Sequence, residues 1–70
     1  MSQHIEKMEL ELKELNEKIE KATKFLEKET LMPAFTDNAQ RHKLEHQIWH
    51  MTEYSKVLKE RIEYDKAKTK

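Results

Sequence analysis

Several residue types that shape many small domains are missing from this 70-residue chain. It has no cysteine, so it can form no disulfide and has no thiolate chemistry, a composition that suits a reducing cytosol. It also has no glycine and a single proline, which disfavours sheets joined by tight turns. Long helices stabilised by side-chain packing are the expectation that remains, and we predict an all-α fold.

The chain has no excess of either charge, because 14 Lys and Arg residues balance 14 Asp and Glu residues. Without a broad basic field it has little to attract a nucleic-acid polymer. It also lacks an apolar run long enough for a membrane span or a signal peptide. We therefore expect a soluble, cytoplasmic protein whose partners include neither nucleic-acid polymers nor membranes.

The residues needed for common enzyme mechanisms are absent too. There is no glycine for a phosphate-binding loop and no cysteine nucleophile. The few Ser and Thr residues have no nearby base with an orienting partner. We predict a protein that is not an enzyme and has no cofactor.

What the chain does have is two apolar stripes with alternating spacings of three and four, the pattern of packed helices. The first stripe consists of Ile5, Met8, Leu12, Leu15, Ile19, Ala22 and Leu26. The second consists of Leu44, Ile48, Met51, Ser55, Leu58 and Ile62. The stripes predict helices over about residues 3–28 and 38–66, followed by a short basic tail at 67–70.

The segment "ETLMPAFTDNAQ" separates the stripes and predicts a turn over about residues 29–37. Pro33 cannot continue a helix, and either Asp37 with Gln40 or Thr36 can cap the next one. Residues 1–70 should form one antiparallel, coiled-coil-like helical hairpin. Its closed end should be filled by Leu31, Met32 and Phe35.

A second row of side chains lies about 100–150° around the second helix from the first stripe. It consists of His50, Tyr54, Val57, Arg61 and Tyr64. In the first helix Leu10 and Phe25 also lie off the stripe. One partner helix cannot cover both rows, so we predict that hairpins assemble into a homo-oligomeric bundle, a dimer or a higher ring.

Part of this second row has the chemistry of a nucleotide site. Gln47, Tyr54 and Arg61 are spaced by seven residues, with His50 nearby. Arg61 could hold a phosphate while Tyr54 stacks on a base and Gln47 reads its edge. The alternative is that these residues form inter-helix hydrogen bonds that fix the register of the bundle.

Trp49 points away from the stripe, which predicts either a subunit contact that buries its ring or a surface for another partner. Its neighbours His42, His46 and His50 are spaced by four residues, so adjacent pairs could share a metal ion. A structural zinc site usually needs four ligands, and His42 and His50 are more than two turns apart. We predict no metal site.

The segment "LEHQIWHMTEYSKVLKERI" resembles the second helix of a family of very short helical-hairpin proteins encoded by tailed bacteriophages. The residues that carry the resemblance are Gln47, Met51, Tyr54, Leu58, Arg61 and Ile62. The preceding "KIEKATKFLEKETLMPAF" is similar to the end of that family's first helix and its turn, so the resemblance covers about residues 12–64. Lys43 and Trp49 depart from the pattern, where aliphatic residues would be expected.

The resemblance implies a phage accessory protein in the cytoplasm of an infected bacterium. Small oligomeric phage hairpins of this kind include counter-defence proteins that trap nucleotide immune signals, which gives the first hypothesis: a sponge using Gln47, His50, Tyr54 and Arg61. The second hypothesis is a module that inhibits or redirects a host defence protein through its apolar outer surface. That surface would include Leu10, Phe25, Trp49, Val57 and Tyr64.

Overall fold

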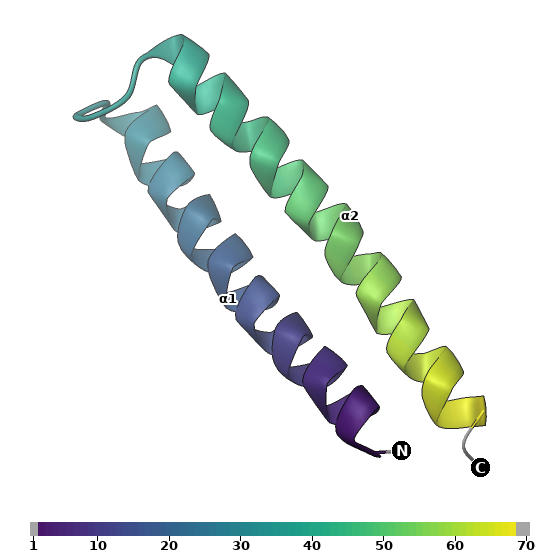
Figure 1. Cartoon of the computed structure of the whole chain (residues 1–70). Coiled ribbons are helices and arrows are strands. Elements are labelled where there is room, and N and C mark those ends of the chain that lie inside the picture. The colour runs from purple at the N-terminus through teal and green to yellow at the C-terminus, as the bar shows by residue number, and fades with distance from the viewer. Residues whose placement is uncertain (1, 69–70) are drawn as a thin grey trace.

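The protein is an antiparallel pair of long helices (Figure 1). The computed structural model describes residues 2–68, and side chains from His4 onward. Helix α1 spans Ser2–Leu31, helix α2 spans Asn38–Lys68, and both described ends of the chain lie at the same end of the molecule. The molecule measures 50 × 15 × 13 Å. The predicted all-α hairpin is thereby confirmed for the described residues.

Both helices extend beyond their predicted ends. Helix α1 continues past Lys28 to Leu31, and Met32 N still donates to Lys28 O at 2.9 Å. It stops there because the residue before a proline, here Met32, is disfavoured in the α conformation. Helix α2 includes the first two residues of the predicted basic tail, and the rest of that tail lies outside the described residues.

The two apolar stripes form the seam between the helices, as their spacing predicted. Every stripe residue is buried or half-buried. The buried apolar side chains among the described residues are Met8, Leu58 and Ile62, with Ile5 and Leu12 packed against them. All of these residues lie in the half of the hairpin that carries the chain ends, so the apolar core occupies only part of the length of the helices.

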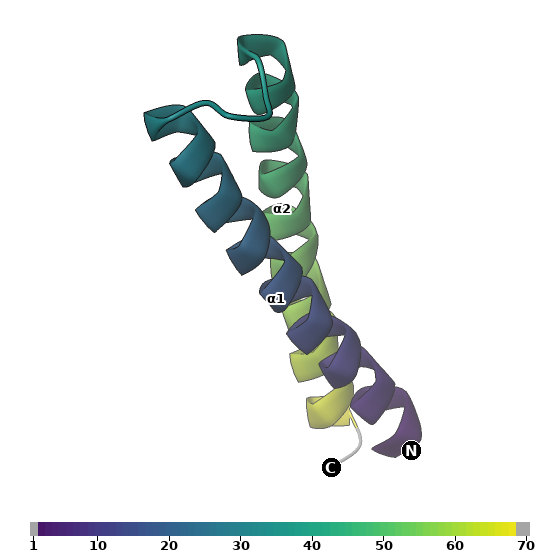
Figure 2. The same cartoon turned by 90° about the vertical axis from the view of Figure 1, so that its left-hand side faces the viewer.

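Toward the turn the seam opens. Figure 2 shows α1 and α2 crossing in the lower part of the view and diverging toward the turn. Leu26 and Leu44, the stripe residues nearest the turn, are only half-buried. The turn half of the hairpin is consequently less well packed than the half with the chain ends.

Polar contacts across the seam set the register of the helices. Lys66 Nζ lies 2.7 Å from Glu9 Oε2, and Ser55 Oγ donates to Asn16 Oδ1 at 2.9 Å. The stripe position occupied by Ser55 therefore makes a hydrogen bond where the other positions make apolar contacts. Single exposed contacts of this kind add little stability, but each is satisfied only when the helices are correctly aligned.

Helix α2 begins with the reciprocal cap predicted for Asp37 and Gln40. Gln40 N donates to Asp37 Oδ1 at 2.8 Å, and Asp37 N donates to Gln40 Oε1 at 2.9 Å. The alternative cap, Thr36, has a different role. Its hydroxyl donates to Glu29, and its carbonyl oxygen accepts a hydrogen bond from Arg41 at 2.7 Å.

Glu29 organises the turn, a role that the sequence analysis did not predict. Its side chain is fully buried, and its carboxylate accepts hydrogen bonds from three backbone amides, those of Ala34, Phe35 and Thr36, at 2.9–3.4 Å. The Thr36 hydroxyl donates a further bond of 2.8 Å. The described residues need no positive φ angle to make this turn, so a chain without glycine can form it.

The prediction that Leu31, Met32 and Phe35 fill the closed end is wrong for the single hairpin. Leu31 is 87% exposed, and Met32 and Phe35 are each 78% exposed. The space inside the turn is occupied by the Glu29 carboxylate and the amides that bind it. The apolar side chains consequently project outward.

The hydrogen bonds to Glu29 make the stability of the turn dependent on pH. The amide of Phe35 and the hydroxyl of Thr36 stabilise the charged carboxylate and hold the pKa of Glu29 below its ordinary value of 4.5. A group with a lowered folded-state pKa contributes stability in full above its unfolded pKa. That contribution is lost as the pH falls through the lower folded pKa.

We expect Glu29→Gln to lower the thermal midpoint at neutral pH, because an amide replaces the carboxylate that the turn amides bind. Below about pH 4.5 the wild type should lose this advantage, so the midpoints of the two proteins should converge. Circular dichroism melting from pH 2 to pH 7 measures the difference. Glu27→Gln, an exposed change beside the turn, is the control; equal effects of the two substitutions at neutral pH would contradict the role of Glu29.

Candidate functional site

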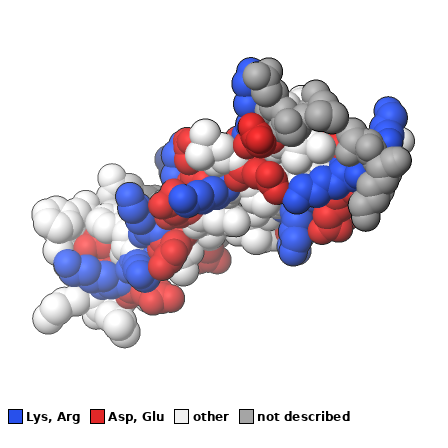
Figure 3. Space-filling model, turned by 90° about the horizontal axis from the view of Figure 1, so that it is seen from below, with Lys and Arg blue, Asp and Glu red and all other residues white. Residues whose placement is uncertain are grey.

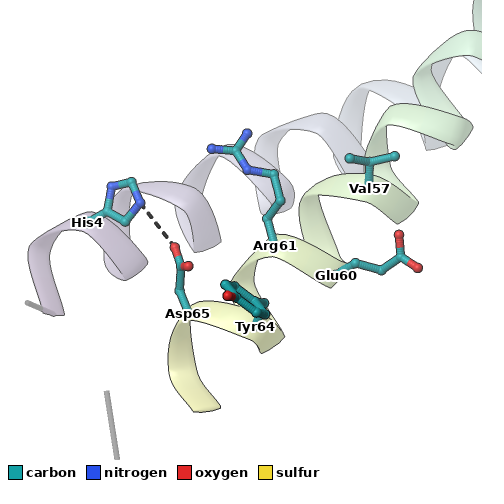
Figure 4. A pocket seen from close by; sticks show the side chains of 6 residues that line it. All are labelled: His4, Val57, Glu60, Arg61, Tyr64 and Asp65. Atoms are coloured by element: carbon teal, nitrogen blue, oxygen red, sulfur yellow. Dashed lines mark ion pairs between the residues drawn. The ribbon is translucent and has the colours of Figure 1, made fainter. Parts of the chain in front are cut away.

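A shallow groove of about 460 Å³ lies beside α2 near the ends of the chain (Figure 4). Three of the predicted site residues, Val57, Arg61 and Tyr64, meet in it because they lie one helical turn apart on one face of α2. His4 of α1 completes one wall. The full lining is His4, Val57, Glu60, Arg61, Tyr64 and Asp65.

The guanidinium of Arg61 is the most distinctive group in the groove. Figure 4 shows it extending from α2, while the Glu60 carboxylate points away from it. Among the described residues Arg61 makes no hydrogen bond or ion pair, whereas Asp65 Oδ2 lies 3.2 Å from His4 Nε2. A guanidinium with unused N–H donors is suited to bind a phosphate or carboxylate.

Tyr64 supplies the aromatic surface of the groove and is 67% exposed. Lys68 Nζ lies 5.9 Å from the centre of its ring, so a second cation stands close to the groove. Val57, half exposed, adds an apolar contact one turn before Arg61. The groove thus combines positive charge with a ring and an aliphatic surface, the features that suit a phosphorylated ring compound.

Tyr54 is also on this face, but its hydroxyl is occupied. It donates to Glu11 Oε2 of α1 at 2.5 Å, which raises the pKa of Tyr54 above its ordinary value of 10.0 because ionisation would bring two negative charges into contact. The nearby charge of Arg61 acts weakly in the opposite direction. The inter-helix hydrogen bond proposed as the alternative role therefore exists for Tyr54, while its ring remains partly exposed.

The remaining predicted ligand residues, Gln47 and His50, do not line this groove on the same chain. Gln47 is exposed and lies 14 residues before Arg61, about 21 Å along the helix. His50 lines a second hollow of about 520 Å³ with Glu45, His46 and Trp49. One hairpin alone therefore does not bring the four ligand residues together.

Trp49 is 59% exposed, and its ring makes an edge contact of 5.1 Å with the ring of His50. The rings of His42 and His46 lie 4.7 Å apart. Across the part of the chain that the structure describes, no group of three His, Asp or Glu side chains could hold a metal ion. Leu10 and Phe25, the predicted contacts on α1, are likewise exposed on the single hairpin.

The surface of the molecule carries both charges in mixture. Figure 3 shows Lys and Arg interspersed with Asp and Glu on the face drawn, and residues of the other types projecting at the turn end. Across residues 2–68, neither helix has a stretch long and apolar enough to span a lipid bilayer. The attraction available to a charged ligand is therefore local, at the groove, and does not come from a field over the whole face.

A sequence model of the Sequestin family matches residues 2–64, which include both stripes, the turn and the groove residues up to Tyr64. The chain belongs to the Sequestin family. Searches of curated proteins and of solved structures give no match. The family name points to sequestration, that is, to binding a partner molecule and withholding it.

Parts of the site that this Sequestin-family hairpin places together are not predictable from sequence spacing. His4 and Asp65 border the groove from different helices, and only their pairing across the seam brings them there. For Glu29 a signal was present: it continues the first stripe three residues after Leu26, where an apolar residue would be expected. A carboxylate at a seam position just before a turn indicates bonds to backbone amides.

We expect the alkaline titration of Tyr54 to have its midpoint above 10.0, and Glu11→Gln to lower that midpoint because the acceptor loses its charge. The chain has two tyrosines, so a Tyr64→Phe background leaves Tyr54 as the single reporter. Tyrosinate absorbance follows the ionisation. Glu14→Gln, on an exposed part of α1, should leave the midpoint unchanged; the same midpoint with and without the Glu11 charge would show that the inter-helix bond is absent in solution.

Proposed function

We propose that this protein is a non-enzymatic phage accessory protein that sequesters a small nucleotide-derived signal of the host's antiviral defence. It would act in the cytoplasm of the infected bacterium. The observation that carries the proposal is the Arg61 guanidinium, which makes no hydrogen bond or ion pair with any described residue, in a groove that Tyr64 also lines. Membership of the Sequestin family supports the general activity of withholding a partner molecule.

The groove residues have separate roles in this proposal. Arg61 binds a phosphate with two parallel N–H donors, as guanidinium groups do in many phosphate sites. The exposed rings of Tyr64 and Tyr54 offer faces on which a base can stack. No group in the groove needs to break a bond in the ligand, so binding alone is the function.

A second copy of the chain completes this site. Gln47 and Arg61 are each seven residues from Tyr54, one before it and one after it. If two α2 helices pair antiparallel about Tyr54, Gln47 of each copy lies opposite Arg61 of the other, because the two positions are symmetric about that centre. Two equal sites then form, each with phosphate-binding and base-reading groups from different copies.

The same pairing would cover surface that the hairpin leaves in water. Tyr54 is 44% exposed and Val57 is 50% exposed on the single chain. Burying such side chains stabilises an interface by about 25 cal/mol for each Å² of apolar area. The ligand would then be enclosed between subunits, which slows its release compared with an open groove.

We expect a nucleotide signal to raise the melting temperature of the wild-type protein, and Arg61→Ala to abolish most of that rise. Loss of a charge-assisted hydrogen bond costs about 1.5–3 kcal/mol, which corresponds to roughly a 10- to 150-fold weaker affinity. Thermal shift and calorimetry with cyclic dinucleotides, cyclic trinucleotides and ADP-ribose derivatives measure both quantities.

Lys59→Ala is the matched control, because it removes one positive charge from an exposed position of α2 outside the groove. It should leave the affinity within about twofold of the wild-type value if charge contributes only locally. Binding that Arg61→Ala does not weaken would place the ligand elsewhere. Absence of stabilisation by every compound in the panel would remove the proposal.

A second candidate function is supported by Trp49, a large exposed ring beside a hollow formed with Glu45, His46 and His50. Exposed tryptophans are frequent anchors of protein interfaces. In this proposal the protein docks on a host defence protein and inhibits or redirects it. The two candidates use different parts of α2, so substitutions separate them.

If this second function holds, Trp49→Ala should remove at least one host protein from those that the tagged wild type retains from bacterial lysate. Truncation of an anchoring tryptophan commonly costs 2 kcal/mol or more, or about 30-fold in affinity. Lys59→Ala, at an exposed position of α2 outside this hollow, tests whether the loss is specific to Trp49. Identical sets of retained proteins for the wild type and Trp49→Ala would count against this candidate.

A further inference from the structure

The turn has its polar groups inside and its apolar groups outside. The carboxylate of Glu29 is fully buried, while Leu31, Met32 and Phe35 include the most exposed apolar side chains among the described residues. Figure 3 shows that residues other than Lys, Arg, Asp and Glu project at this end of the molecule, with charged residues between them. Several large apolar side chains exposed together at one end of a highly charged protein are typical of an interaction surface.

This apolar tip, formed by Leu31, Met32 and Phe35, is held in a fixed shape. The amide of Phe35 donates to Glu29 Oε1 at 3.0 Å, and Arg41 Nη1 fastens the far side of the turn by donating to Thr36 O at 2.7 Å. Because these bonds hold backbone atoms, the path of the chain around the tip cannot change without breaking them. A rigid surface loses less conformational entropy on binding than a mobile loop.

Beside the tip, α1 carries a mainly apolar hollow of about 430 Å³. It is lined by Thr23, Leu26, Glu27, Thr30 and Leu31. Leu26 is a half-buried seam residue, and it is accessible here because the helices diverge toward the turn (Figure 2). The same end of the hairpin thus has both projecting apolar side chains and an apolar hollow.

The total surface of the hairpin indicates how much of it needs covering. A compact folded chain of 8.5 kDa exposes roughly 4,700 Å². The hairpin exposes 5888 Å², a difference of about 1,200 Å² from that expectation. A standard protein interface buries about 800 Å² on each partner. The surplus is sufficient for one such interface on each chain.

We propose that the turn end of this protein binds the turn end of a second copy, with Phe35 and Met32 of each chain entering the hollow beside Leu26 of the other. Such an exchange is the contact expected of a two-fold dimer, in which each copy gives and receives the same side chains. The net charge of zero removes the general repulsion that identical charged chains would experience. The apolar tip of one copy and the apolar hollow of the other are chemically complementary, so no third molecule is needed between them.

This contact is separate from the groove at Arg61, which lies toward the other end of α2. If ligand binding also pairs chains through their α2 helices, the contact at the turn joins two such pairs. Self-association through the turn is measured without any nucleotide, so its failure and the failure of the proposed ligand site are distinguishable.

The test compares the mass in solution of the wild type and Phe35→Ser by light scattering and sedimentation at the same micromolar concentration. We expect the mass of Phe35→Ser to fall to half that of the wild type or less, with the helical circular dichroism signal retained. Lys13→Ser, an exposed change on α1 away from the tip, should keep the wild-type mass. A monomeric wild type, or equal masses for the wild type and Phe35→Ser, would overturn the proposal.

A second measurement leaves the tip intact. Because the chain has no cysteine, Lys28→Cys and Lys7→Cys each introduce one site for a spin label, near the turn and near the chain ends respectively. The distance between labels on different copies should be well below the 50 Å length of the molecule for Lys28→Cys, and longer for Lys7→Cys. The reverse order of distances, or the absence of any intermolecular distance, would rule out the turn contact.

Discussion

The structure depends on one constraint: each helix has a single neighbour and can bury only one stripe of side chains against it. Met8, Leu58 and Ile62 are buried in this seam, and the other stripe residues are half-buried. Helices of 30 and 31 residues have further faces, and those faces remain in water on a single chain. The exposed groove, the exposed Trp49 and the apolar tip are all consequences of this geometry.

Where apolar burial is limited, hydrogen bonds determine the shape of the molecule. The Glu29 carboxylate accepts hydrogen bonds from the backbone amides of the turn, and the Asp37–Gln40 cap defines the start of α2. Along the seam, Tyr54 with Glu11 and Ser55 with Asn16 align the helices. Val57, Arg61 and Tyr64 lie together on one side of α2 because of their spacing, and the register of the helices brings His4 beside them. Among the described residues the Arg61 guanidinium has no partner, and this is the basis of the function proposed for this member of the Sequestin family.

Much of the fold could be predicted because it is encoded locally. The three-four spacing identified the seam, Pro33 identified the turn, and Asp37 with Gln40 identified a cap, since each signal lies within a few residues of its effect. The candidate site was predictable only in part. Arg61, Val57 and Tyr64 share a helix face and could be grouped from spacing, whereas His4 and Asp65 are 61 residues apart and meet only through the pairing of the helices.

The sequence by itself determined that the chain makes two amphipathic helices with an interruption between them, because helical periodicity is a property of a single segment. Only the tertiary structure decided that Glu29, and not Leu31 or Phe35, occupies the inside of the turn. It also decided that the Tyr54 hydroxyl binds Glu11 on the other helix. These outcomes depend on the relative rotation, alignment and divergence of the two helices. Such quantities arise from contacts between distant residues, and no local pattern specifies them.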